Sequence, residues 1–257
     1  MPAPIAEKVY GNLKARIYKT KEELGRAAAE LAAERVREIL ATKERANLLF
    51  STGASQFEFV AALRDVGIDW SRVAGFHLDE YKGMSPDHPA SFRLWLRQRI
   101  EGPLRPAVFH YIEGDAPDPE AECERYAALI EANPIDLAFV GIGENGHIAF
   151  NDPPVADFND PKLVKIVELD EACRRQQLGE GWFPTLEDVP REALTLTVPA
   201  IMRSKRIISV VPDERKAVAV QRALEGPIET ACPASILRTH PDVTLFLDEA
   251  SASKLSL

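Results

Sequence analysis

The chain has 257 residues, of which 46% are hydrophobic and 28% charged, and its formal net charge is −9. This length and apolar content suffice for a substantial core, so we predict one α/β domain over residues 1–257. The acidic balance, with no basic tract and no array of stacking aromatic residues, argues against a nucleic-acid partner.

The cysteines predict a reducing environment. Cys123, Cys173 and Cys232 form no CxxC pair, which argues against a disulfide framework and against a structural zinc site. Residues 1–18 lack the apolar core of a signal peptide, and no run of about 18 apolar residues indicates a membrane span. We therefore expect a cytoplasmic protein without a membrane partner.

The first strong local signal is a helix start. Thr20 followed three residues later by Glu23 is a capping box. Apolar residues then recur at helical spacing as far as Ile39. We therefore predict a long helix directly after Thr20.

A strand over Ala46–Phe50 runs into a short loop of glycine and hydroxyl residues, and residues 57–63 look helical again. The order strand, loop, helix predicts a phosphate cradle, because amides at a helix N-terminus and loop hydroxyls donate to an anion. An ordinary capped turn gives the same pattern, and the Walker sequence GxxxxGK[ST] is absent. The loop residues are Thr52, Gly53, Ala54 and Ser55.

A third strand, over residues 73–78, ends at two neighbouring carboxylates, Asp79 and Glu80. In a strand-end loop, one of them is a candidate general base for removing a proton from a carbon beside a carbonyl. A capping or turn aspartate is the alternative interpretation. Helical segments are predicted next over residues 91–99 and 117–132.

Residues 136–153 carry the clearest functional signal. The apolar run Leu137–Val140 gives way to glycines, among them Gly146, and to a lone histidine, His147. This predicts a buried strand that delivers an imidazole to its carboxyl end, where open α/β sheets place their chemistry. A glycine loop with a hydrogen-bonded histidine is the alternative. The proline-rich residues 151–161 are interpreted as an active-site loop or a surface excursion.

In the C-terminal third, strands are predicted over residues 193–198, Ile207–Val211 and residues 243–247. A helix over residues 213–224 puts Lys216 in a first helical turn, close to a strand end. A cation there opposes the helix dipole unless it faces an anion, so Lys216 is a candidate phosphate contact. A surface lysine is the alternative.

Several longer motifs follow one another along the chain: GFHLDEYKG (75–83), HPASF (88–92), GDAPDPEAECERY (114–126), DLAFVGIGENGHIAFNDP (136–153), ALTLTVP (193–199), RKAVAVQRALEG (215–226) and ILRTHP (236–241). In order and spacing they resemble the glucosamine-6-phosphate deaminases over nearly the whole chain. The related 6-phosphogluconolactonases typically carry Asp-Glu-Arg where this chain has Asp79-Glu80-Tyr81. They also carry a Ser-Leu-Phe-Pro-like run at residues 149–152. Both differences favour the deaminase branch.

The resemblance implies an open, mostly parallel twisted sheet with helices on both faces, a Rossmann-like three-layer sandwich. It implies that Asp79 is the enolising base, which moves a proton between C2 and C1 of the opened amino sugar. His147 matches the acid/base that opens the ring. Lys216 and the loop of residues 52–55 match the groups that hold the 6-phosphate, and neither a metal nor an organic cofactor is implied.

Three positions depart from the family pattern. Asn145 stands where many members have an aspartate that orients the histidine. Asp152 replaces a glutamate and is one methylene shorter. Gly181 stands where an Arg-Phe-Phe motif supplies a substrate-binding arginine, and Arg174 or Arg175 could reach the site instead, with surface charges as the alternative.

The function that the resemblance implies is isomerisation and deamination of glucosamine 6-phosphate to fructose 6-phosphate and ammonia, by an enzyme of hydrolase or isomerase type. The alternatives are an isomerase or deaminase of another sugar phosphate, a lactonase-like hydrolase, and a sugar-phosphate sensor without catalysis. Residues 154–160 are acidic and apolar, so we expect no phosphate-binding allosteric site there. The expected partner is a small sugar phosphate. Assembly into a homo-oligomer is possible on the sequence alone.

Overall fold

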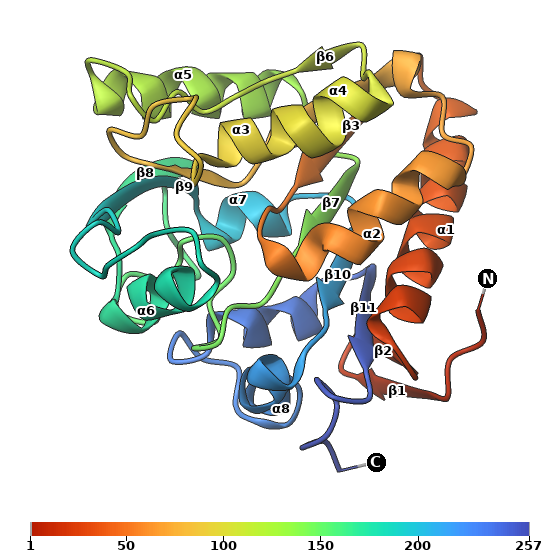
Figure 1. The fold of residues 1–257 in the computed structure, drawn as a ribbon. Coiled ribbons are helices and arrows are strands. Elements are labelled where there is room, and N and C mark those ends of the chain that lie inside the picture. The colour runs from red at the N-terminus through yellow and green to blue at the C-terminus, as the bar shows by residue number, and fades with distance from the viewer. Residues whose placement is uncertain (1, 257) are drawn as a thin grey trace.

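An eight-stranded sheet lies between two layers of helices in the computed structural model, which describes residues 2–256 (Figure 1). Its strand order is β1-β2-β11-β10-β7-β3-β4-β6, and every neighbouring pair is parallel except β1 with β2. This confirms the predicted fold class. The strands are β1 (Ala6–Tyr10), β2 (Leu13–Tyr18), β3 (Ala46–Phe50), β4 (Val73–His77), β6 (Val108–Phe109), β7 (Leu137–Val140), β10 (Ile207–Val211) and β11 (Val243–Asp248).

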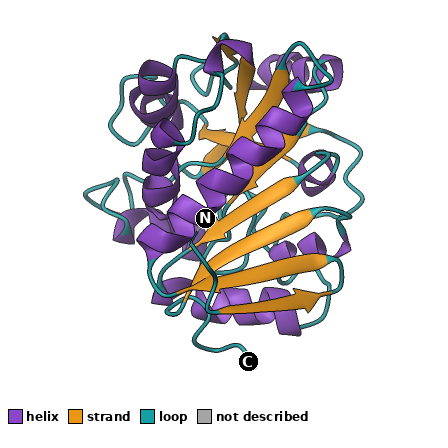
Figure 2. Cartoon of the chain, turned by 90° about the vertical axis from the view of Figure 1, so that its right-hand side faces the viewer, coloured by secondary structure: helices purple, strands orange, loops and turns teal. Residues whose placement is uncertain are grey.

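Helices cover both faces of this sheet, so the strands lie side by side with helices in front and behind (Figure 2). One buried cluster joins the strands to α1, α2 and α3, and another joins them to α5, α7 and α8. The helices are α1 (Lys21–Leu40), α2 (Phe57–Ala62), α3 (Phe92–Leu96), α4 (Gly102–Leu104), α5 (Pro119–Ala132), α6 (Glu171–Gly179), α7 (Val198–Met202) and α8 (Ala217–Glu225). No helix of residues 2–256 is both long and apolar enough to cross a membrane.

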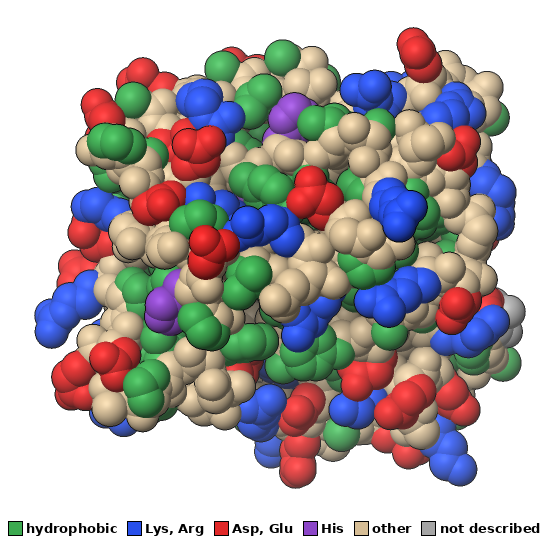
Figure 3. All heavy atoms as spheres, turned by 45° about the horizontal axis from the view of Figure 1, so that its top comes forward, with side chains coloured by type: hydrophobic (Ala, Val, Ile, Leu, Met, Phe, Trp, Pro, Cys, Tyr) green, Lys and Arg blue, Asp and Glu red, His purple; other side chains and the backbone are tan. Residues whose placement is uncertain are grey.

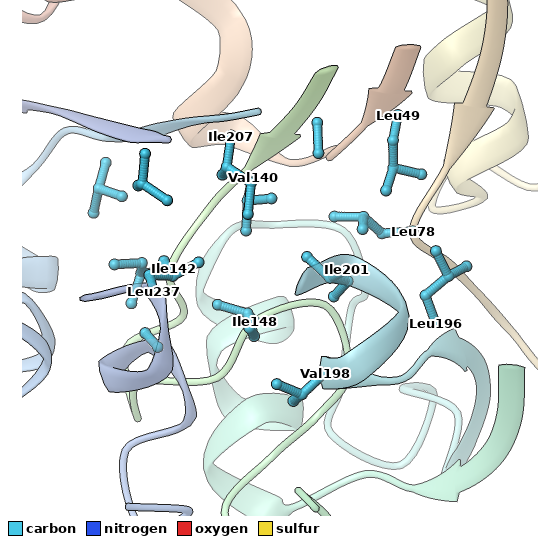
Figure 4. Close-up of a cluster of buried hydrophobic side chains, with 14 of the residues drawn as sticks. Leu49, Leu78, Val140, Ile142, Ile148, Leu196, Val198, Ile201, Ile207 and Leu237 are labelled. Carbon is cyan, nitrogen blue, oxygen red and sulfur yellow. The ribbon is translucent and has the colours of Figure 1, made fainter. Parts of the chain in front are cut away.

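Successive side chains of each strand contribute alternately to the two buried clusters. Leu48 packs on the α1 side and its neighbour Leu49 on the α7 side, because successive residues of a strand point to opposite faces. Figure 4 shows Val140 and Ile207 on their strands, opposite Ile201 of α7. Since both faces are covered, the central strands β3, β7 and β10 are buried throughout and mostly apolar, as buried parallel strands usually are.

A second, three-stranded antiparallel sheet stands beside the first. It contains β5 (Asp79–Tyr81), β9 (Glu192–Leu196) and β8 (Val164–Glu168), in that order. The prediction of a strand-end loop at Asp79 and Glu80 is therefore wrong. After β4 the chain leaves the larger sheet at Leu78, whose carbonyl accepts from the Leu196 amide at 2.8 Å, and it continues as a strand of the smaller one.

The predicted helix after Thr20 is confirmed as α1. The Thr20 hydroxyl accepts from the Glu23 amide at 3.2 Å, as a capping box requires. The reciprocal bond differs, since the Glu23 carboxylate accepts from the amide of Lys19 and not from that of Thr20.

Helix α1 packs on α2 through a glycine. A Cβ atom on Gly25 would lie 2.7 Å from the backbone of Glu58 and Phe59. The helices can approach this closely only because residue 25 has no side chain. Since α2 follows the loop after β3, this contact also helps to fix that loop.

We expect Gly25→Ala to lower the free energy of unfolding by about 1–2 kcal/mol. Overpacking against rigid backbone costs about 1–3 kcal/mol, and the better helix propensity of alanine offsets about 1 kcal/mol of it. Urea unfolding measures the difference. Gly179→Ala is the matched control, because no atom lies within 4 Å of a Cβ there. Equal stability of the two variants would contradict the steric argument.

Candidate active site

The loops after four neighbouring strands meet at one edge of the larger sheet. The chain runs from β3 to β4 but returns to β7 on the opposite side of β3. Such a reversal leaves a crevice at the carboxyl ends of the strands, where open α/β sheets bind ligands. A cleft that opens to solvent lies here, with about 550 Å³ of empty space including part of the solvent at its mouth. The residues singled out in the sequence that line it are Thr52, Gly53, Ser55, Asp79, His147 and Lys216.

The loop after β3 presents hydroxyl groups to this cavity. Gly53 has a φ of +102°, which L-residues rarely adopt, and it precedes a turn of 3-10 helix (Ala54–Gln56). Gln56 ties the turn to β10 by donating to the Val210 carbonyl at 3.2 Å. Because α2 has only six residues, the hydroxyls of Thr52 and Ser55 are stronger candidates for anion contacts than the helix dipole.

Two other residues predicted to bind the sugar phosphate, Ala54 and Gly146, do not line the cavity. Ala54 lines a neighbouring depression with Ser55 and Lys216. Gly146 has a φ of +91°, and a Cβ atom there would lie 2.7 Å from Sγ of Cys232. The glycine therefore allows close packing of the loop after β7.

Lys216 is a buried cation that faces the cavity. Its residue is only 4% exposed, and its ammonium has no hydrogen bond or ion pair with any residue of the described chain. Burial lowers its pKa, while the charges of Glu180 and Glu144 act in the opposite direction. A buried charge without a partner is unfavourable, so the arrangement is typical of a site that receives an anion.

Asp79 and Glu80 point to opposite faces of β5 and are used differently. Glu80 accepts from the Ser91 hydroxyl at 2.8 Å and the Arg93 amide at 3.0 Å, and it pairs with the Arg93 guanidinium. Asp79 lines the cavity. Burial raises the pKa of Asp79 well above its usual range, and the Glu80 charge adds to the rise. The carboxylate that is open to a ligand is therefore Asp79.

His147 is held by a carboxylate behind it. Its Nδ1 lies 2.9 Å from Oδ1 of Asp152, so the shorter side chain reaches the ring. Asn145 donates to the same carboxylate oxygen at 2.9 Å and accepts from the His147 amide at 3.0 Å. Burial alone would raise the pKa of Asp152, but hydrogen bonds from His147, Asn145 and the Asp170 amide, with the His147 charge, hold it below its usual range.

The two candidate arginines are engaged away from the cavity. The Arg174 guanidinium donates to the carbonyls of Leu186 and Val189, at 2.6 and 3.0 Å. Arg175 is exposed and pairs with Glu171. Neither lines the cavity, which differs from the expectation that one of them replaces the missing family arginine.

Helix α6 nevertheless supplies a wall of the cavity, through residues that the sequence analysis did not single out. These are Gln176, Gln177 and Glu180. Their spacing follows one helical face, which is the signal that could have identified them. The arginines precede them on the helix and face elsewhere.

One group of described side chains has metal-ligating atoms close together. Ligand atoms of His147, Asp152 and Cys173 lie within 4.8 Å of one another, and all three residues are buried. Nδ1 of His147 and Oδ1 of Asp152 already contact each other at 2.9 Å. The arrangement therefore serves to orient the imidazole.

Comparison with known proteins places the chain in a family. A family model described as glucosamine-6-phosphate isomerases/6-phosphogluconolactonase matches residues 19–246. The chain belongs to this family. The resemblance found in the sequence is thereby confirmed.

Individual members of the family differ in how similar they are. A glucosamine-6-phosphate deaminase of Bacillus thuringiensis (strain Al Hakam) is 38% identical over 240 residues, which cover 93% of this chain and 88% of that protein. A solved structure described as a monomeric glucosamine-6-phosphate deaminase has a TM-score of 0.84 and 32% identity, over 93% of this chain and 98% of the other.

A 6-phosphogluconolactonase from Trypanosoma brucei has a TM-score of 0.74 at 18% identity, over 98% of this chain and 100% of the other, and so shares the fold. The deaminase names do not support the broad label of hydrolase that the resemblance suggested.

We expect Asp152→Asn to destabilise the protein by about 1–3 kcal/mol at pH 7, because it removes a buried charged acceptor. The pKa of Asp152 is depressed in the fold, so its ionisation stabilises the protein above the unfolded value of about 3.9. That stabilisation is lost as the pH falls through the folded pKa. The gap between variant and wild type should therefore shrink from pH 7 to pH 3.

Urea unfolding at both pH values measures this gap. The control is Asp65→Asn, since Asp65 is exposed. A gap that is the same at pH 3 as at pH 7 would show that the charge of Asp152 does not stabilise the fold.

Proposed function

We propose that this protein converts glucosamine 6-phosphate and water to fructose 6-phosphate and ammonia. The observation that carries the proposal is the unpaired Lys216 ammonium, which shares one cavity with an uncommitted carboxylate, Asp79, and with the oriented imidazole of His147. The deaminase names of the similar proteins support the choice of substrate. Because both sheets and α6 contribute to the cavity, we also propose that the whole chain acts as one domain.

In the proposed mechanism, phosphate binding sets the position of the sugar. Lys216 and the hydroxyls of Thr52 and Ser55 hold the 6-phosphate, which directs C1 and C2 toward Asp79 and His147. Holding the reacting atoms in this way replaces a random encounter by a fixed geometry. The cation and the reacting carboxylate lie at separate strand ends, after β10 and β4.

The proposed chemistry needs two proton-transfer groups. His147 moves a proton from the C1 hydroxyl to the ring oxygen, which opens the pyranose. Asp79 then takes the proton from C2 while O1 of the aldehyde gains a proton, which gives an enolamine. Asp79 returns its proton to C1 and the amino group gives up one proton, so that a ketose imine forms. Water adds to C2 of the imine, and ammonia leaves.

The raised pKa of Asp79 is suited to this task. A base whose pKa lies nearer to the working pH holds the abstracted proton more readily. We include a cytoplasmic setting in the proposal, supported by the free state of all three cysteines.

An assay of several hexose and hexosamine 6-phosphates for ammonia and for ketose formation tests the proposal. Ammonia and fructose 6-phosphate in equal amounts from glucosamine 6-phosphate are the expected result. Ketose without ammonia from another substrate would identify an isomerase, and hydrolysis of a 6-phosphogluconolactone would identify a lactonase. Binding of these ligands without turnover would identify a sensor.

We expect Asp79→Asn to keep its fold and its phosphate binding but to lose about 10²- to 10⁴-fold in turnover, the typical contribution of a proton-transfer group. Steady-state ammonia release measures turnover, and calorimetry with inorganic phosphate measures binding. The control is Asp87→Asn, at an exposed aspartate. Near-wild-type turnover of the folded Asp79→Asn protein would remove Asp79 from the mechanism.

Two charge changes at the phosphate end should act in opposite directions. Lys216→Gln should raise KM roughly 10- to 150-fold, because a hydrogen bond to a charged group contributes about 1.5–3 kcal/mol. Glu180→Gln should lower KM, because the Glu180 carboxylate repels a phosphate near Lys216. Lys254→Gln, at an exposed lysine, is the control. A shift of KM in the same direction for both variants would contradict this placement of the phosphate.

A further inference from the structure

The wall formed by Gln176, Gln177 and Glu180 of α6 (the α6 wall) contains a side chain, Gln177, whose amide donates to no other residue that the structure describes. Gln177 is only 7% exposed and lines the cavity. Its Oε1 accepts from the Tyr81 hydroxyl at 2.8 Å. Its Nε2 donates to no residue of the described chain, so both of its N–H groups are available to a ligand.

The orientation of this amide is set by a rigid partner. Tyr81 is fully buried, and its ring packs against Phe92, Phe150 and Phe183 at centroid distances of 5.0, 5.3 and 5.5 Å. Its hydroxyl therefore has little freedom to follow a moving neighbour. While Oε1 is held by this hydroxyl, Nε2 is directed to the other side.

The wall has different chemistry at its two ends. Asp79 and Tyr81 are two residues apart in β5 and so share a face of the strand, which places Gln177 at the Asp79 end. Glu180 lies at the phosphate end, with Oε2 3.7 Å from where a Cβ atom on Gly53 would be. Gln176 belongs to the same end, since it donates to Glu180 at 2.9 Å.

We propose that Gln177 is a specificity-determining residue that donates from Nε2 to a hydroxyl or carbonyl oxygen of the open-chain sugar beside Asp79, and that Tyr81 is its positioning residue. This inference rests on the proposed function for the kind of ligand, a polyhydroxylated sugar phosphate. A neutral amide supplies donors without a positive charge. It therefore leaves the raised pKa of Asp79 in place, whereas a cation there would lower it.

The test compares two ligands that occupy different parts of the cavity. The first is 2-amino-2-deoxyglucitol 6-phosphate, a reduced open-chain sugar that cannot react, and the second is inorganic phosphate. Calorimetry gives the dissociation constant of each for the wild type and for Gln177→Met, Gln177→Glu, Tyr81→Phe and the Tyr81→Phe/Gln177→Met double variant. Gln98→Met, at an exposed residue, is the control.

Gln177→Met should weaken binding of the sugar analogue about 2- to 12-fold, the range for a neutral hydrogen bond, and leave inorganic phosphate binding unchanged. Gln177→Glu should weaken binding of the sugar analogue further. The glutamate keeps an acceptor for the Tyr81 hydroxyl, but it replaces the donor Nε2 by an oxygen that cannot donate. Tyr81→Phe should have a smaller effect, and the double variant should bind no more weakly than Gln177→Met alone, since Tyr81 acts through Gln177.

Three results would overturn the inference: unchanged binding of the sugar analogue in Gln177→Met, an equal loss for inorganic phosphate, or additive effects in the double variant. The assay separates this inference from the proposed function. A wild-type protein that binds the analogue but releases no ammonia from glucosamine 6-phosphate would end the proposed function, while the binding comparison would still decide the role of Gln177.

Discussion

Parallel pairing of β3 with both β4 and β7 is the constraint on which the site depends. It aligns the carboxyl ends of these strands and of β10 at one edge, so that loops far apart in the chain share a cavity. Each loop contributes a different group. Fixing these groups on rigid strand ends limits how far they can move relative to one another, which proton transfer requires. The covered faces of the sheet supply that rigidity.

The site combines groups that are unfavourable for folding. The ammonium of Lys216 and the carboxylate of Asp79 are buried, and the raised pKa of Asp79 reflects that burial. Such desolvation lowers stability, which the two large cores offset. On the outer face in Figure 3, by contrast, acidic and basic side chains are interspersed. The outer charges are solvated, whereas Lys216 and Asp79 in the cavity are buried.

The sequence predicted β3 (Ala46–Phe50) and β10 (Ile207–Val211) with their observed bounds, because a strand that is buried on both faces is a continuous apolar run. It did not predict β5, since Asp79-Glu80-Tyr81 has no apolar alternation and is buried by contacts distant in sequence. The sequence placed Asp79, His147 and Lys216 each shortly after a predicted strand, which is why they could be expected near one another. The glutamines of α6 were not singled out, because their spacing shows a shared helical face but not that this face meets a cavity.

The α6 wall comes from an excursion between β7 and β10 that also contains β8 and β9 of the smaller sheet, whereas Asp79, His147 and Lys216 follow β4, β7 and β10 of the larger one. The residues proposed for proton transfer therefore lie close to the strands of the larger sheet, and the residue proposed for selectivity lies on a helix farther along the chain. Because no residue of α6 pairs in either sheet, replacements in the α6 wall leave the strand pairing untouched. An enzyme built in this way can acquire a new substrate during evolution by changing a single helix, while the chemistry that it performs is inherited intact.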